Sequence, residues 1–87
     1  MPEISMFYGI IIYMFAGQKE HNPPHFHAWF GEYEAEFLLN GDILKGSMPK
    51  NKQKLIEAWA EIHAEELAAD WELCRQGLAP YKIAPLR

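Results

Sequence analysis

Residues 25–45 read HFHAWFGEYEAEFLLNGDILK, and the pattern of this segment predicts the centre of a β-sheet. Two turn signals divide it: Gly31-Glu32 is typical of a type II′ turn, and Asn40-Gly41 is typical of a type I′ turn. The three segments around these turns are rich in strand-forming residues and alternate between apolar and polar side chains. We therefore expect three consecutive antiparallel strands joined by two-residue turns.

The register of these strands follows from the turns. With two residues in each turn, Phe37 pairs with Leu44 on an apolar face. The other face then carries a polar row of His27, Glu36 and Lys45 across the three strands. A shift by one residue would destroy both faces, because successive side chains of a strand point to opposite sides of the sheet.

The segment before the hairpins is expected to add a further strand. Residues 4–15 are apolar at most positions, which is typical of one long strand buried on both faces. Gly9 is expected to form a bulge or bend within this strand. The loop that follows ends in Pro23-Pro24, and the two prolines restrict the backbone before them to extended geometry.

The segment after the hairpins is expected to be helical. Residues 48–77 carry apolar residues at steps of three and four, which predicts a helix with one apolar stripe. Ser47 is the expected N-cap, and Gly77 is the expected residue at which the helix stops. Such a helix would be about 40 Å long, so a break between His63 and Leu67 is an alternative.

Together these patterns predict a single α+β domain over residues 1–87. Its sheet, at residues 4–46, is four-stranded and mainly antiparallel, with a long first strand followed by the two hairpins. One long or broken C-terminal helix, at residues 48–77, covers one face of the sheet. Residues 78–87 are expected to dock as an extended tail.

The composition bounds the classes of function. The 87 residues include 8 basic and 12 acidic side chains, and the net charge of −4 disfavours nucleic-acid binding driven by charge alone. The single Cys74 excludes an internal disulfide and a cysteine-rich zinc site. The apolar run at residues 9–16 is too short to cross a membrane, and no basic leader precedes it. We therefore expect a cytoplasmic protein with no membrane role.

The segment HNPPHFHA, which begins at His21, holds the strongest candidates for chemistry. His25 and His27 lie two apart on a strand, so their rings leave one face about 6–7 Å apart. Glu36 is predicted beside His27, and His21 is supplied by the loop, so these four residues are candidate ligands of a divalent metal. Lys45 beside Glu36 opposes a metal, because its charge neutralises the carboxylate. We expect no cofactor and keep a divalent metal as the alternative.

Two other interpretations of the histidines stay open. In the first, Glu36 bridges a histidine and Lys45 as a hydrogen-bonded row on the surface of the sheet. In the second, a contact between His27 and Glu36 favours the charged imidazolium and supports proton chemistry. His25, His27 and Glu36 are therefore the candidate catalytic residues.

Three lysines open the predicted helix. Lys50, Lys52 and Lys54 lie in its first two turns, where the helix dipole disfavours cations. They form either a solvated face or a site for an anion or an acidic partner beside the free amides of the helix start. The candidate binding residues are therefore His21, Asn22, His25, His27, Trp29, Lys45, Lys50, Lys52 and Lys54.

Five motifs spread over nearly the whole chain carry a resemblance. They are PEISxFYGI at 2–10, HNPPHFHA at 21–28, GSxP at 46–49, WEL at 71–73 and IxPL at 83–86. With them the chain resembles a small bacterial domain-of-unknown-function family that is marked by the HNPPHFHA segment. The resemblance implies a protein encoded beside another small domain, in gene pairs of toxin–antitoxin type.

Two functions from different classes are expected. One helix can cover one face of the sheet, so the other face, with Trp29, Leu38 and Ile43 beside the histidines, is left for a partner. We therefore expect a protein-interaction or regulatory domain of a two-gene toxin–antitoxin-type module rather than an enzyme. Its partner is a protein encoded nearby or a second copy of the chain, and nucleic acid is not favoured. The alternative is a histidine-cluster, metal-dependent hydrolase or nuclease.

Overall fold

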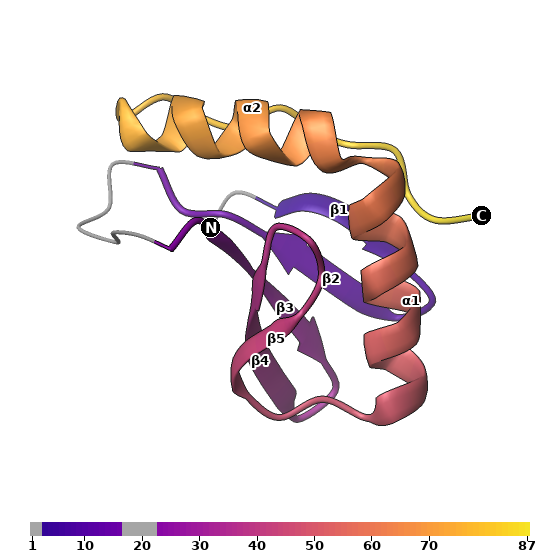
Figure 1. Cartoon of the computed structure of the whole chain (residues 1–87). Coiled ribbons are helices and arrows are strands. Elements are labelled where there is room, and N and C mark those ends of the chain that lie inside the picture. The colour runs from indigo at the N-terminus through magenta and orange to yellow at the C-terminus, as the bar shows by residue number, and fades with distance from the viewer. Residues whose placement is uncertain (1–2, 17–22) are drawn as a thin grey trace.

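The computed structural model describes residues 3–16 and 23–87. An antiparallel five-stranded sheet, in the order β1-β2-β3-β4-β5, is followed by two helices (Figure 1). The strands are β1 (Glu3–Phe7), β2 (Ile10–Tyr13), β3 (His25–Phe30), β4 (Tyr33–Leu38) and β5 (Ile43–Gly46). The helices are α1 (Lys50–Ile62) and α2 (Ala64–Arg75), and the chain turns sharply between them. Neither helix is long and apolar enough to span a bilayer, in the part of the chain that is described.

The apolar segment that was expected as one long strand is a hairpin, so the prediction of four strands is wrong. Tyr8 and Gly9 have φ angles of 50° and 80°, and positive values at both central residues are typical of a type I′ turn. Phe7 pairs with Ile10 across this turn. Both arms contribute buried residues to the core, so the apolar run did not reveal where the chain reverses.

The predicted register of the central hairpin is confirmed. β3 and β4 pair from Phe30 and Tyr33 beside the turn to His25 and Leu38 at the far end. Every pair between these limits is the expected one. The faces of both strands are therefore assigned as the sequence predicted.

The second hairpin differs from the prediction at its turn. Leu38 donates its backbone N–H to the Asp42 carbonyl (2.8 Å), and Gly41 donates its N–H to the Leu38 carbonyl (2.8 Å). These bonds enclose a loop of residues 39–41, one residue longer than expected. Gly41 closes the loop with a φ of 95°, a conformation that other residues rarely adopt.

A bulge compensates for the longer loop. Phe37 pairs with Ile43 instead of Leu44, and the register shifts between Phe37 and Glu36. Leu44 is the extra residue on β5, so Glu36 still lies beside Lys45 as predicted. The two one-residue irregularities cancel, and the polar row is preserved.

Helix α1 packs against the inner face of the sheet, which we define as the face that carries Phe26. Trp59 of α1 is fully buried, and its ring centroid lies 5.3 Å from that of Phe7 and 5.7 Å from that of Phe26. The other buried core residues are Ile4, Ile10, Ile12, Met14, Ala28, Ala35, Phe37, Met48, Ile56, Ala60, Leu67, Trp71, Cys74 and Ile83.

The helical region is broken, which was one of the two predicted alternatives. His63 separates the helices with φ −110° and ψ 29°. The prediction of Ser47 as N-cap is wrong: Pro49 holds that position, and the Ser47 N–H donates to the Glu34 carbonyl of β4 (3.2 Å). The chain beyond β5 is still bound to the sheet there, so the helix starts later. Gly77 follows the C-cap as predicted.

The C-terminal tail docks on the edge of the sheet and on α2. The Ile83 N–H donates to the Ile4 carbonyl (2.7 Å), at the irregularity that leaves Ile4 outside the β1–β2 pairs. Asp70 of α2 accepts the Tyr81 N–H at Oδ1 (2.9 Å). The tail therefore covers part of the free edge of β1.

We predict that Gly41→Ala destabilises the domain. An added Cβ would lie 2.7 Å from the backbone Cα of Glu57 in α1, and a φ of 95° is strained for alanine. We expect urea denaturation to show a loss of about 2–4 kcal/mol in the free energy of unfolding. Gly31→Ala is the matched control, because its φ is also positive (58°) but no atom lies within 4 Å of an added Cβ. Gly31→Ala should lower the free energy of unfolding by about 1 kcal/mol. Equal losses in the two variants would contradict a contribution from the contact with Glu57.

A second prediction concerns Asp70, which is 2% exposed and whose Oδ2 has no hydrogen-bond partner among the described residues. Burial raises the pKa of this carboxyl above its usual value. The folded state therefore binds the proton more tightly than the unfolded state does. As the pH rises from the unfolded pKa of Asp70 through its folded pKa, the carboxyl ionises and the free energy of unfolding falls. Asp70→Asn keeps an oxygen for the Tyr81 N–H and should gain stability relative to wild type with rising pH. Denaturation at several pH values tests this, and a difference independent of pH would contradict it.

Candidate functional site

The outer face of the sheet, opposite to Phe26, carries two rows of side chains that cross the strands. The first row crosses all five strands and consists of Glu3, Tyr13, His27, Glu36 and Lys45. The second row crosses β1 to β4 and consists of Met6, Ile11, Trp29 and Glu34. The predicted polar row is thus part of a longer row, to which β1 and β2 add an acidic and an aromatic residue.

Aromatic rings on this face and one ring from α2 form what we call the ring cluster: Tyr13, Phe15, His25, His27, Trp29 and, from α2, Trp71. Tyr13 stacks on His27 with centroids 5.3 Å apart, and Trp29 meets Tyr13 edge-on at 5.4 Å. His25 lies 5.2 Å from His27 and 5.3 Å from Trp71 of α2. The histidines are 7% and 9% exposed, whereas Trp29 is 38% exposed. The ring cluster is therefore buried at its two histidines and open to solvent at Trp29.

Glu34 joins the two rows at the exposed margin of the ring cluster. The Tyr13 hydroxyl donates to Glu34 Oε2 over 2.8 Å. Hydrogen bonds from Tyr13 and, second, from Trp29 lower the pKa of the Glu34 carboxyl below its usual value. Glu34 thus holds two rings in place and presents a negative charge beside them.

His25 is held between the backbone and a carboxylate. Its Nδ1 lies 2.9 Å from the Pro23 carbonyl, which can only accept a hydrogen bond, so the ring proton is on Nδ1. Its Nε2 lies 3.9 Å from Glu36 Oε1. This distance is too long for a hydrogen bond, and the contact is an ion pair only when the imidazole is protonated, so the hydrogen-bonded row of the sequence interpretation stays a prediction.

The proposed metal ligands are brought together only in part. His21 and Asn22 lie outside the described residues. Within residues 3–16 and 23–87, no group of three or more His, Cys, Asp or Glu side chains is placed to hold a metal ion. His25, His27 and Glu36 therefore do not form such a group by themselves.

Two pockets hollow the outer face. The larger has a volume of about 290 Å³ and is lined by Phe15, His27, Glu34, Ala35, Glu36, Lys45 and Gly46. The smaller, which we call the tryptophan pocket, has a volume of about 170 Å³ and is lined by Glu3, Ile11, Tyr13 and Trp29. The Tyr13–Glu34 hydrogen bond connects the linings of the two pockets.

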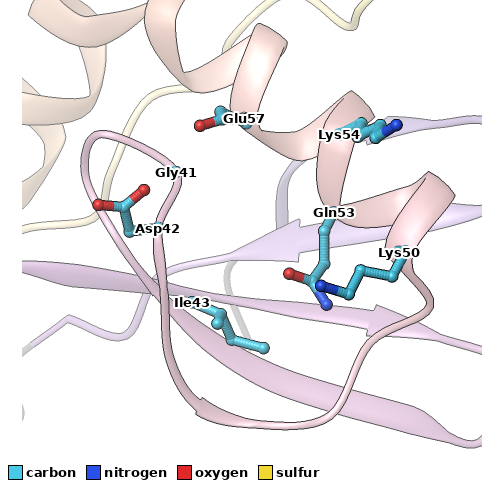
Figure 2. A pocket seen from close by; sticks show the side chains of 7 residues that line it. All are labelled: Gly41, Asp42, Ile43, Lys50, Gln53, Lys54 and Glu57. Carbon is cyan, nitrogen blue, oxygen red and sulfur yellow. The ribbon is translucent and has the colours of Figure 1, made fainter.

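The three lysines at the start of α1 do not gather at one site. Lys50 and Lys54 line a pocket of about 390 Å³ between α1 and the β4–β5 loop, whereas Lys52 Nζ lies 4.7 Å from the centroid of an aromatic ring of β3. Asp42 and Glu57 line the same pocket, and Figure 2 shows Lys54 extending away from the loop. The charges in this pocket are mixed, which does not favour an anion.

The sequence candidates did not include seven residues of the two rows and the ring cluster: Glu3, Met6, Ile11, Tyr13, Phe15, Glu34 and Trp71. Tyr13 was missed because β1 and β2 were joined into one strand, which left β2 without a register against β3. A signal was present, since Ile11, Tyr13 and Phe15 lie two apart and so share a face of a strand. Trp71 comes from a distant helix, and no local pattern predicts its contact with the sheet.

A protein-family model described as "Domain of unknown function (DUF4160)" matches residues 9–72. The match begins in the first turn and ends in α2, so it includes the HNPPHFHA segment and most of both outer rows. No curated protein and no solved structure matches the chain.

We predict that Tyr13→Phe raises the pKa of Glu34 toward its usual value, because the largest cause of the lowered pKa is removed. Titration of the Glu34 side-chain carbon by NMR measures the change. Tyr33→Phe is the matched control, since it removes a hydroxyl from the residue next to Glu34. Equal titration curves for wild type and Tyr13→Phe would contradict the role of the hydrogen bond.

Proposed function

Since the chain belongs to the DUF4160 family of domains of unknown function, we propose its function from the geometry of its sheet. The domain is a protein-interaction module that docks a partner protein on its outer face, at the open end of the ring cluster. The observation that carries this proposal is the exposure of Trp29 at the margin of an otherwise buried group of aromatic rings.

The composition of the open end supports a protein partner. Trp29 and Met6 are 38% and 56% exposed in the same cross-strand row, and Ile11 between them is partly buried. Aromatic residues and methionine are enriched at protein interfaces, and tryptophan is frequent among the residues that dominate binding energy. Carboxylates at Glu34 and Glu3 surround this apolar centre with a polar rim, which is the usual anatomy of an interface.

The burial of the histidines favours an interaction module over a hydrolase. A general base must come within hydrogen-bond distance of its substrate. His25 and His27 are less than one-tenth exposed and pack against Trp71 and Tyr13, and the His25 Nδ1 is bound to a backbone carbonyl. We therefore assign His25 a structural role in the ring cluster. His27 also lines the larger pocket of the outer face, so it stays the candidate residue for the alternative hydrolase function.

For the identity of the partner we propose the product of the neighbouring gene, in a two-gene module of toxin–antitoxin type. The support is the resemblance carried by the HNPPHFHA segment and the four motifs around it. A separate measurement assigns the side of the pair, because growth arrest on expression of one gene alone identifies the toxin.

We predict that this protein co-purifies with the neighbouring gene product and that Trp29→Ala weakens the complex. Truncating a central interface tryptophan typically costs about 2 kcal/mol or more, which is about 30-fold in the dissociation constant. Calorimetric titration of the purified partners measures the loss. Ile62→Ala is the control, because Ile62 is an exposed apolar residue (67%) at the end of α1 rather than on the sheet.

Two results would contradict the proposal. One is a complex whose affinity is unchanged by Trp29→Ala, although circular dichroism shows that Trp29→Ala and Ile62→Ala are folded. The other is a dimer of this chain alone that Trp29→Ala dissociates in sedimentation experiments, since a second copy would then occupy the outer face.

A further inference from the structure

We infer that the tryptophan pocket binds the guanidinium group of an arginine side chain on the partner protein. This inference rests on the proposed interaction function and names the chemistry that the outer face recognises. The pocket is lined by Glu3 of β1, Ile11 and Tyr13 of β2, and Trp29 of β3, so neighbouring strands of a sheet fix its walls.

The walls of the pocket offer aromatic surface to a cation. Trp29 and Tyr13 meet edge-on, with an interplanar angle of 71° and centroids 5.4 Å apart, so their ring faces point in different directions. Tyr13 is 2% exposed and fixed by its stack on His27, whereas Trp29 keeps 38% of its surface open. A cation over the exposed indole gains a cation–π interaction, which is strongest for tryptophan among the aromatic residues.

The charges around the pocket have the sign that a cation requires. Glu3 lines the pocket directly and is the cross-strand neighbour of Tyr13. Glu34 is the cross-strand neighbour of Trp29 and accepts the Tyr13 hydroxyl, so a second carboxylate borders the same two rings. Negative charge next to an aromatic face strengthens its attraction for a cation.

A weak internal ion pair does not block the pocket. Lys82 Nζ lies 4.0 Å from Glu3 Oε2, and its side chain is 74% exposed. Exposed pairs of this kind contribute little to stability, so an arginine that also stacks on Trp29 can replace the lysine.

Guanidinium fits this site better than ammonium does. The guanidinium group is planar, stacks on aromatic rings and donates paired hydrogen bonds to a carboxylate. Trp29 supplies the ring and Glu3 supplies the carboxylate at one pocket. An ammonium group satisfies the charge but neither the stacking nor the paired hydrogen bonds, so arginine is the expected side chain.

The experiment titrates the whole protein with N-acetyl-arginine methylamide and follows the Trp29 indole resonance by NMR. We expect a saturable shift, weaker binding of the lysine analogue, and no shift with the neutral citrulline analogue. Trp29→Ala should abolish binding, measured by the shift of the Ile11 methyl resonance. Glu3→Gln should weaken it about threefold or more, and Glu32→Gln is the control that removes the same charge from the exposed β3–β4 turn.

Equal shifts with the arginine and citrulline analogues would overturn the inference, as would equal affinities of Glu3→Gln and Glu32→Gln. Equal binding of the lysine analogue would overturn the assignment of guanidinium. The failure of this inference is distinguishable from that of the proposed function. If Trp29→Ala weakens the protein complex and Glu3→Gln does not, the result supports the interaction function and contradicts the arginine site. If the arginine analogue binds and Trp29→Ala leaves the affinity of the protein complex unchanged, the result contradicts the proposed function.

Discussion

Successive residues of β3 and β4 point to opposite faces, so the pairing of His27 with Glu36 places all of their neighbours. In this register Phe26 turns inward to Trp59, while Trp29 turns outward beside Glu34. A slip by one residue would bury glutamates under α1 and expose phenylalanines to water. The core and the outer face are therefore two consequences of one register, and neither can change without the other.

The β4–β5 loop and a bulge in β5 are both irregular, and together they keep the predicted pairing of Glu36 with Lys45. The β4–β5 loop is one residue longer than its Asn-Gly signal predicts, and the bulge at Leu44 removes the resulting shift before Lys45. The longer loop brings Gly41 against α1, where a side chain on Gly41 would meet the backbone of Glu57. Glu36 still pairs with Lys45 because the longer loop and the bulge shift the register by one residue in opposite directions.

The outer face shows how a small domain places charge beside buried rings. His25 and His27 are enclosed by Tyr13 and Trp71, and their main contacts are with rings, a backbone carbonyl and Glu36. The histidines are buried, and Trp29 is the member of the cluster that is most exposed to solvent. The same stretch that suggested metal or proton chemistry therefore lies beside the proposed docking surface, where aromatic side chains pack against both histidines.

Alternation and capping are local properties, so the amino-acid sequence alone predicted the α+β class, the register of β3 with β4, the polar row and the end of the helical region at Gly77. It did not show the reversal at Tyr8-Gly9, since apolar residues of both arms of that hairpin enter the core. Tertiary structure alone decided that Tyr13 and Trp71 close over the histidines and that Lys50 and Lys52 separate. The physical reason is that these contacts join strands and helices far apart in the chain, where no periodic pattern links one residue to the other.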